Sequence, residues 1–247
     1  MHYLGRILSI ILLLAGTAGA TLAGGVDNSI YGELLAKHVR SGRVDYDGFK
    51  SDEALLDQYL SILSGTDPQS LTRNHQFAFY INAYNAFTIK LILTHYPEIN
   101  SIKEIGSFFS GPWSKKFISL DGWNVSLDHI EHEVLRPRFK DPRIHFAINC
   151  AARSCPPILD RPYEGDRIEA QLDTQTRAFI NNPKSTFVKD DKLFISKIFD
   201  WFEEDFNDNP LLFIRQYAGD RLRADLDAAG PEVKIVYLHY NWSLNRK

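Results

Sequence analysis

The chain has 247 residues, of which 44% are hydrophobic and 24% are charged, and its formal net charge is −3 at neutral pH. These values are typical of a soluble globular protein. The net negative charge, with no cluster of basic residues, argues against nucleic acid as a partner and against attachment to an anionic membrane surface.

The first 20 residues have the pattern of a secretory signal peptide. An apolar stretch from Ile7 to Ala15 is followed by small residues, with Ala18 and Ala20 at the −3 and −1 positions of a cleavage site. Cleavage is expected after Ala20 or, alternatively, after Ala23. The apolar stretch is about half of the roughly 20 residues that span a bilayer, so no stable membrane anchor is expected. The sequence therefore predicts a periplasmic or secreted protein, with residues 21–247 forming a single globular domain.

The N-terminal half is predicted to be mainly helical. Its expected elements are a helix at 30–39, an extended segment at 44–49, helices at 52–63 and 72–94, a turn at 102–105, and a hairpin of 116–120 with 123–126. The segment 72–94 is apolar nearly all round, which is typical of a buried helix, and Asn82 marks the point where a break would occur. The hairpin is predicted because Asp121-Gly122 is a strong turn dipeptide.

The C-terminal half mixes short helices with strands. Its expected elements are a helix at 126–134, an apolar strand at 143–149, a loop at 150–163, a helix at 167–181, strands at 186–189 and 192–196, helices at 198–202, 210–217 and 221–228, and a strand at 234–239. Strands and helices do not alternate with βαβ spacing. The pattern therefore indicates an α+β fold, with one helix-rich domain around a small, mainly antiparallel sheet.

Polar residues inside apolar surroundings are the candidates for function. Asn82, Tyr84 and Asn85 lie within one turn of the predicted buried helix, where each amide needs several hydrogen-bond partners. Two interpretations remain open: the amides hold a neighbouring loop, or they contact a ligand. Trp113 is a candidate for the wall of a substrate groove, together with Trp123 and Tyr163.

A cluster of acids and histidines occupies the predicted helix at 126–134. Asp128 and His132 are neighbours at i and i+4, whereas Glu131 lies about 100° round the helix from His132. Glu131 and His132 can therefore line one site without bonding each other as helical neighbours. The alternative is a solvated charged face.

Two cysteines, Cys150 and Cys155, follow the predicted strand at 143–149, and Arg153 adds positive charge between them. A thiol at the end of a strand can act as a nucleophile if a histidine lowers its pKa. The preferred constellation is Cys150 as nucleophile, His132 as base, and Glu131 or Asp128 as the orienting acid. His145 is the alternative base, but in an extended strand it would lie roughly 16 Å from Cys150 on the opposite face.

Two other states of the cysteines compete with a free nucleophile. In an exported protein they could form a disulfide. They could also be buried thiols or metal ligands, although a C-x₄-C pair with widely spaced histidines is not a common zinc pattern. No metal and no cofactor is therefore expected.

Several segments resemble the domain of unknown function 547 family. They are FYINAYNAFTIKLIL at 79–93, SLDHIEHEVLR at 126–136, DPRIHFAINCAARSCPP at 141–157, SKIFDWFEEDF at 196–206 and NWSL at 241–244, so the resemblance extends over about 76–244. The resemblance implies that Cys150 is the functional thiol, because family members usually keep it, whereas plant members have serine at the position of Cys155. It also implies a distant similarity to papain-like or transglutaminase-like enzymes. In papain-like enzymes the cysteine precedes the histidine, whereas His132 precedes Cys150, so a different histidine such as His145 stays in consideration.

The leading hypothesis is an exported cysteine-dependent hydrolase or acyl transferase that acts on an amide or thioester bond of a peptide-like substrate. Backbone N–H groups of the cysteine loop, with Asn82 or Asn85, would stabilise the oxyanion, and Arg153 would contribute to binding. The alternatives are a non-enzymatic domain that binds an envelope ligand or protein, and a thiol redox or metal-binding protein.

Overall fold

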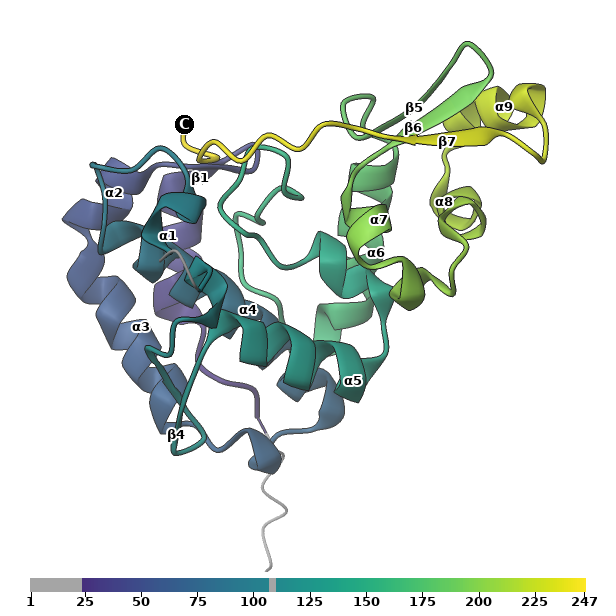
Figure 1. The fold of residues 1–247 in the computed structure, drawn as a ribbon. Coiled ribbons are helices and arrows are strands. Elements are labelled where there is room, and N and C mark those ends of the chain that lie inside the picture. Colours follow the sequence, from purple (N-terminus) through teal and green to yellow (C-terminus); the bar gives the residue numbers. More distant parts are fainter. Residues whose placement is uncertain (1–23, 107–109) are drawn as a thin grey trace, which may run out of the picture.

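The computed structural model describes residues 24–106 and 110–247. The predicted signal peptide lies outside the described residues. No helix in the described ranges is long and apolar enough to cross a membrane. The fold is α+β, as predicted, with helices α1 to α5 packed together and a small sheet with α8 and α9 beside them (Figure 1).

The N-terminal part contains α1 (Ser29–His38), a short hairpin of β1 (Val39–Arg40) and β2 (Arg43–Val44), α2 (Tyr46–Ser51) and α3 (Glu53–Gly65). The prediction of an extended segment at 44–49 was wrong. Asp45 caps a helix there by accepting a hydrogen bond from the backbone N–H of Gly48 at 2.9 Å. Such a cap satisfies a donor that the first helical turn leaves unpaired.

The long helix α4 (Arg73–Leu93) is continuous through Asn82 and almost wholly buried. The side chain of Asn82 bonds the backbone of Tyr163 and so does not interrupt the helix. A hairpin of β3 (Ile118–Leu120) and β4 (Trp123–Val125) follows further along the chain. Its turn residues Asp121 and Gly122 both have positive φ, as a two-residue hairpin turn requires.

The next segments differ most from the predictions. Residues His129–Leu135 are wound as a π-helix, which continues into α5 (Arg136–Phe139). Residues Pro142–Phe146 form a 3-10 helix, so the predicted strand at 143–149 was wrong. Pro142 supplies a helical φ at the first position, and Asp141 accepts a bond from the N–H of Arg143, so this sequence begins a helical turn.

The C-terminal part contains α6 (Ile168–Ile180), β5 (Thr186–Lys189), β6 (Lys192–Ile195), α7 (Ile198–Trp201), α8 (Pro210–Tyr217), α9 (Asp220–Ala229) and β7 (Lys234–Tyr237). Strand β6 is central: it pairs antiparallel with β5 and parallel with β7. A 3-10 helix at Glu203–Phe206 follows α7.

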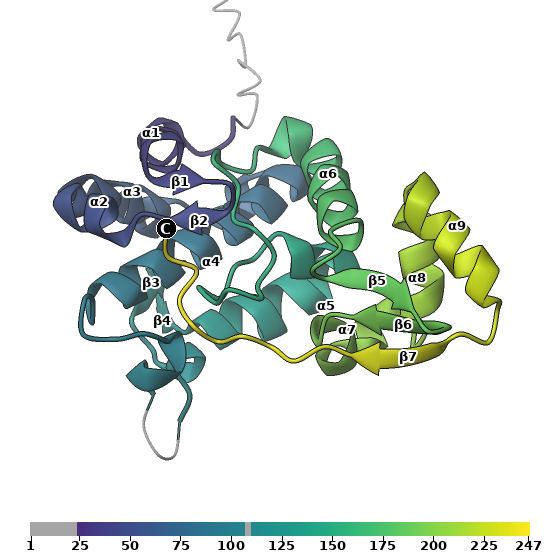
Figure 2. The same cartoon turned by 90° about the horizontal axis from the view of Figure 1, so that it is seen from above.

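Two hydrophobic clusters hold these parts together. The larger surrounds α4 and includes α1, α3 and the π-helix, whereas the smaller joins β6, α7 and α8. After β7 the chain returns across both parts to end beside β1 and β2 (Figure 2). This C-terminal segment, residues 238–247, pairs with the cysteine loop, since the N–H of Arg153 donates to Ser243 O at 2.8 Å.

Candidate functional site

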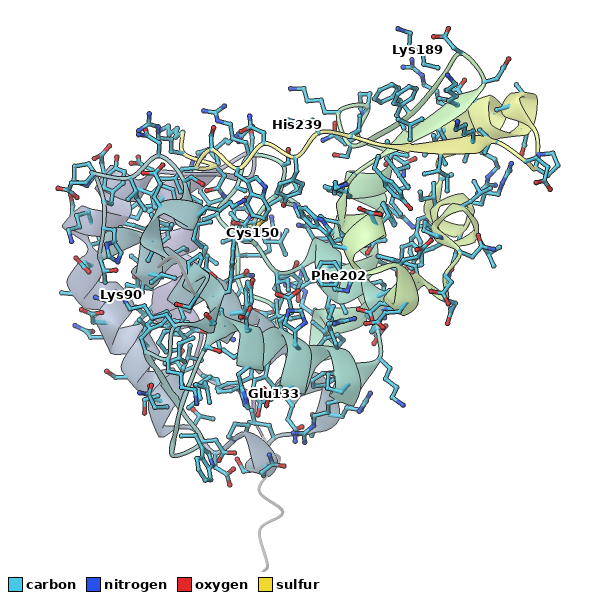
Figure 3. The ribbon with its side chains drawn as sticks, in the orientation of Figure 1. Lys90, Glu133, Cys150, Lys189, Phe202 and His239 are labelled. Carbon is cyan, nitrogen blue, oxygen red and sulfur yellow. A yellow bond between two sulfur atoms is a disulfide. The ribbon has the colours of Figure 1, made fainter. Side chains whose placement is uncertain are left out.

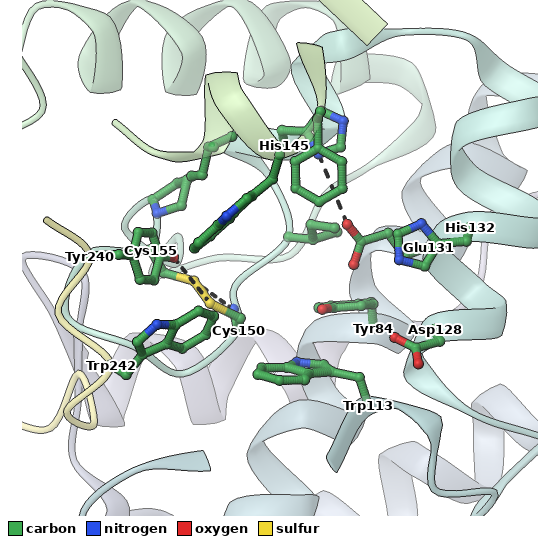
Figure 4. Close-up of a pocket in the computed structure, with 15 residues that line it drawn as sticks. Tyr84, Trp113, Asp128, Glu131, His132, His145, Cys150, Cys155, Tyr240 and Trp242 are labelled. Atoms are coloured by element: carbon green, nitrogen blue, oxygen red, sulfur yellow. Dashed lines mark hydrogen bonds and ion pairs between the residues drawn. A yellow bond between two sulfur atoms is a disulfide. The ribbon is translucent and has the colours of Figure 1, made fainter. Parts of the chain in front are cut away.

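A cavity of about 190 Å³ lies where the two hydrophobic clusters meet. One side carries the acid and histidine groups, and the cysteines face them across the cavity beside Tyr240 and Trp242 (Figure 4). The lining residues are Tyr84, Trp113, Asp128, Glu131, His132, His145, Ile148, Cys150, Cys155, Pro156, Ile198, Trp201, Phe202, Tyr240 and Trp242. The tertiary structure thus brings most of the predicted chemical residues into one place.

Glu131 is the most perturbed acid of the cavity. Burial raises its pKa from the usual 4.5 to about 7, although a hydrogen bond from the Tyr84 hydroxyl opposes that rise. The charge of Asp128 adds to the increase, and burial also raises the pKa of Asp128 itself. A carboxyl that titrates near neutral pH can both donate and accept a proton there.

His145 lies behind Glu131 and is almost fully buried. Its Nε2 is 2.7 Å from Asp205 Oδ2, and its Nδ1 is 4.0 Å from Glu131 Oε1. Burial opposes ionisation of Asp205, but the bonds from His145 and Arg136 outweigh it and lower the Asp205 pKa to about 2. Asp205 is therefore an ionised acceptor, which places the His145 proton on Nε2 and turns the lone pair of Nδ1 towards Glu131.

The ring of His145 is held in place by its neighbours. It stacks on Phe202 with a centroid separation of 4.0 Å, and burial lowers its pKa. Arg136 fixes Asp205 through Nε at 2.6 Å and a second bond from Nη2 at 3.1 Å. Glu131, His145 and Asp205 thus form a buried chain, which we call the proton chain, with Glu131 at the cavity end.

His132 also lines the cavity, but its bonding differs from the one predicted for a base. Its Nδ1 lies 3.1 Å from Nη1 of Arg136, which can only donate. Burial and the Arg136 charge lower the His132 pKa. His132 is therefore neutral, with its lone pair occupied and its remaining ring nitrogen carrying the proton.

The winding of the π-helix explains why the acids and histidine share the cavity. A π-helix has more residues per turn than an α-helix, so the angle between successive residues is smaller than 100°. Asp128, Glu131 and His132 all reach the cavity as a result. Such π-helical segments occur frequently at functional sites.

Cys150 and Cys155 form a disulfide, so neither carries a free thiol in this form. The disulfide alternative is the one that the structure contains, and a nucleophilic Cys150 requires prior reduction. The hydroxyl of Tyr240 lies 3.3 Å from Cys150 Sγ, and the backbone N–H of Cys150 donates to Cys155 Sγ at 2.8 Å. Because Pro142–Phe146 is a 3-10 helix, His145 and Cys150 line one cavity, which corrects the expectation of opposite faces.

The cavity has an aromatic wall. Tyr240 and Trp242 lie with ring centroids 4.6 Å apart, and Trp201 packs on both, at 4.7 and 5.5 Å. Trp113 packs on Trp242 at 5.6 Å, and its buried indole N–H has no acceptor among the described residues. Such a wall offers flat apolar faces to a ligand, with one donor free to bond it.

Some predicted binding residues lie elsewhere. Asn82 exchanges two bonds with the backbone of Tyr163, and Asn85 bonds Ala147 O and the N–H of Asn149. Both amides therefore hold loop backbone, whereas Tyr84 between them reaches the cavity. Tyr163 and Arg153 do not line this cavity, and the Trp123 side chain is 73% exposed on the hairpin.

Sequence reasoning missed Asp205, Arg136, Phe202, Trp201 and the aromatic pair of the C-terminal segment. A signal was available: the family-like segments 196–206 and 241–244 contain Trp201, Phe202, Asp205 and Trp242. Their conspicuous aromatic and acidic residues pointed to a shared site. Within residues 24–106 and 110–247, no three histidine, cysteine or acidic side chains are grouped as metal ligands.

Comparison with known proteins gives a family but no activity. Residues 68–180 match the family model described as "Protein of unknown function, DUF547". This match confirms the resemblance over the part that contains α4, the π-helix and both cysteines. No curated protein and no solved structure matches the chain. The similarity to papain-like or transglutaminase-like enzymes stays a prediction.

Proposed function

We propose that this protein is an exported hydrolase or acyl transferase for an amide or thioester bond, with the aromatic-walled cavity as its active site. The observation that carries the proposal is that Cys150 lines the same cavity as Glu131, a buried carboxyl whose pKa is raised to about 7. A nucleophile and a proton-transfer group in one cavity are the minimum for acyl transfer.

Cys150 acts after reduction. A thiol reductant of the envelope opens the disulfide and leaves two thiols, and Cys150 then loses its proton. The thiolate attacks the carbonyl carbon of the substrate, the leaving amine or thiol takes up a proton, and water or a second acceptor cleaves the resulting thioester. The oxidised form is the resting state.

The proton chain supplies the acid and base for these steps. Glu131 takes the proton at the cavity, and His145 Nδ1, 4.0 Å away, shares it through a small movement. Ionised Asp205 stabilises the positive charge that His145 would acquire, as an orienting acid does in a triad. We therefore assign the role of base to the proton chain and not to His132, because Arg136 donates a hydrogen bond to the lone pair of His132.

The aromatic wall positions the substrate. Trp113, Trp201 and Trp242 offer apolar faces, and the unpaired Trp113 N–H offers one donor to a carbonyl or hydroxyl group. This arrangement suits a peptide-like chain that binds beside the cysteine loop.

Export is part of the proposal. A disulfide is typical of a protein that works outside the reducing cytoplasm, which supports the sequence-based prediction of a periplasmic or secreted location. Cleavage at Ala20 or Ala23 is tested by mass spectrometry of the protein recovered from the envelope or medium.

A second candidate is thiol–disulfide exchange. The disulfide lines a cavity and faces a carboxyl that titrates near neutral pH, and such a carboxyl can take the proton of an attacking or leaving thiol. In this case the substrate would itself be a dithiol or disulfide, and both cysteines would be needed.

Alkylation separates the two candidates. In Cys155→Ser, iodoacetamide should modify Cys150 faster near neutral pH than it modifies Cys155 in Cys150→Ser, which is the matched control. Added to Cys155→Ser, Glu131→Gln and His145→Asn should slow the modification of Cys150, because they remove groups that accept the thiol proton. A Cys150 that reacts no faster than Cys155 would refute the nucleophile. If equilibrium with glutathione instead gives a high reduction potential and Cys155→Ser abolishes turnover of a disulfide substrate, the exchange reaction is supported.

A further inference from the structure

A second hollow lies beside the cavity and is larger, with a volume of about 710 Å³. It is formed where the β1–β2 turn, the cysteine loop, the segment 182–185 and the C-terminal segment meet. Cys155 and Tyr240 line both hollows, so they adjoin at the cysteine loop. One of its lining residues, His239, is labelled in Figure 3 on the C-terminal segment just after β7. We call this hollow the basic groove.

The charge of the basic groove is opposite to that of the chain. Its lining includes Arg43, Arg153, Lys184, Lys197 and His239, and contains no aspartate or glutamate. The whole chain, in contrast, has a net charge of −3. The groove therefore concentrates positive charge in an acidic protein.

Three of these cations have no internal counter-charge. Lys197 pairs with Asp200 at 3.0 Å, but within the described residues Arg43, Arg153 and Lys184 make no ion pair with a carboxylate. Burial lowers the Arg43 pKa, and the charge of Arg153 lowers it further, so the two guanidinium groups repel each other across the groove. An anion bound between the two guanidinium groups would offset this repulsion.

The groove is held in shape by the backbone. Gly42 has a φ of +72°, and a Cβ there would overlap Pro157, so the β1–β2 turn packs directly on the cysteine loop. The N–H of Ser154 donates to Asn241 O at 3.2 Å, and the N–H of Asn241 donates to Ser154 Oγ at 2.9 Å. The turn, the cysteine loop and the C-terminal segment are thus tied together before any ligand arrives.

We propose that the basic groove binds a multiply charged anion through Arg43 and Arg153, with Lys184 as a third contact. Guanidinium groups bind phosphate and carboxylate oxygens in a two-pronged geometry, and two of them favour a ligand with more than one anionic group. The volume of the groove exceeds that of a single phosphate. The proposal is independent of the chemistry in the neighbouring cavity, although a ligand in the groove would lie next to Cys155.

The test uses calorimetric titration of the whole protein with tripolyphosphate at low ionic strength, about 50 mM salt. Wild type should bind, and affinity should fall as salt increases. Arg43→Glu/Arg153→Glu should weaken binding by about tenfold for each arginine. Arg161→Glu/Arg221→Glu, which changes the charge equally at exposed positions outside the groove, is the matched control and should bind as wild type does.

Two results would overturn the proposal: no binding of tripolyphosphate by wild type, or equal losses in the groove and control variants. If the double glutamate variant does not fold, Arg43→Gln/Arg153→Gln, which adds no negative charge, takes its place. Citrate and vesicles with about 30% anionic phospholipid identify the source of the anion. Competition by citrate indicates a carboxylate ligand, and binding to vesicles that exceeds binding to tripolyphosphate indicates a lipid headgroup; each supports an anion site.

Discussion

Replacement of Glu131 by glutamine tests the central feature of the site, the buried carboxyl with a raised pKa. Glutamine has nearly the same shape and can still accept the bond from the Tyr84 hydroxyl, but it never carries a charge. The substitution therefore removes the cost of a buried charge and leaves the packing largely unchanged.

The expected effect depends on pH in a defined direction. The Glu131 pKa is about 7 in the folded protein and 4.5 in the unfolded chain. In the wild type, the contribution of Glu131 to the free energy of unfolding is fully present below pH 4.5, where the carboxyl is protonated. This contribution is lost as pH rises from 4.5 to 7. The difference corresponds to about 3 kcal/mol, since one pKa unit is about 1.4 kcal/mol. Glu131→Gln should match wild type at pH 4.5 and be about 3 kcal/mol more stable at pH 8.

The assay is urea unfolding of the oxidised proteins at several values between pH 4.5 and 8. Glu133→Gln is the control, because Glu133 lies in the same π-helix with a 70% exposed side chain and forms an ion pair with His129 at 2.9 Å. Its effect should stay within about 1 kcal/mol. A difference between Glu131→Gln and wild type that does not change with pH would show that the Glu131 pKa is ordinary, and the proposed acid–base role would fail.

Three further outcomes are expected. Tyr84→Phe removes a hydrogen bond that favours ionised Glu131, so the Glu131 pKa should rise. In the same unfolding series, the variant should lose the Glu131 contribution to stability at a higher pH than wild type does; a loss at lower pH would contradict the assigned bond. Asp205→Asn should cost about 2 kcal/mol at pH 7, and the loss should disappear as pH falls from 3.8 towards 2, because the low Asp205 pKa stabilises the fold only above that range. NMR of His145 should show a lower pKa in that variant. Asn85→Ala should cost about 1–3 kcal/mol in thermal or urea unfolding, since it leaves buried backbone groups of the loop without partners, and an effect near zero would mean that water replaces the amide.

Much of the fold could be predicted from the sequence because it depends on local patterns. The apolar residues of 72–94 predicted the buried helix α4, and Asp121-Gly122 predicted the hairpin turn. These features arise from residues close in the chain, whose periodicity and turn chemistry are visible without tertiary contacts. Two local predictions failed, at 44–49 and 143–149, where capping by Asp45 and Asp141 began helical turns that apolar periodicity did not reveal.

The candidate site was predicted in part. The sequence by itself determined which residues could do chemistry: Cys150, Glu131, His132 and His145 were candidates, and all four line the cavity. Only the tertiary structure decided their roles. Asp205 is 60 residues from His145 in the chain, yet it orients that histidine.

Arg136 likewise occupies the lone pair of His132, and the oxidised Cys150–Cys155 pair determines when a nucleophile exists. Protonation depends on burial and on charges brought close by folding. The sequence determines the residue types. The raised pKa of Glu131, the hydrogen bond to the lone pair of His132 and the basic groove arise only when distant segments pack together.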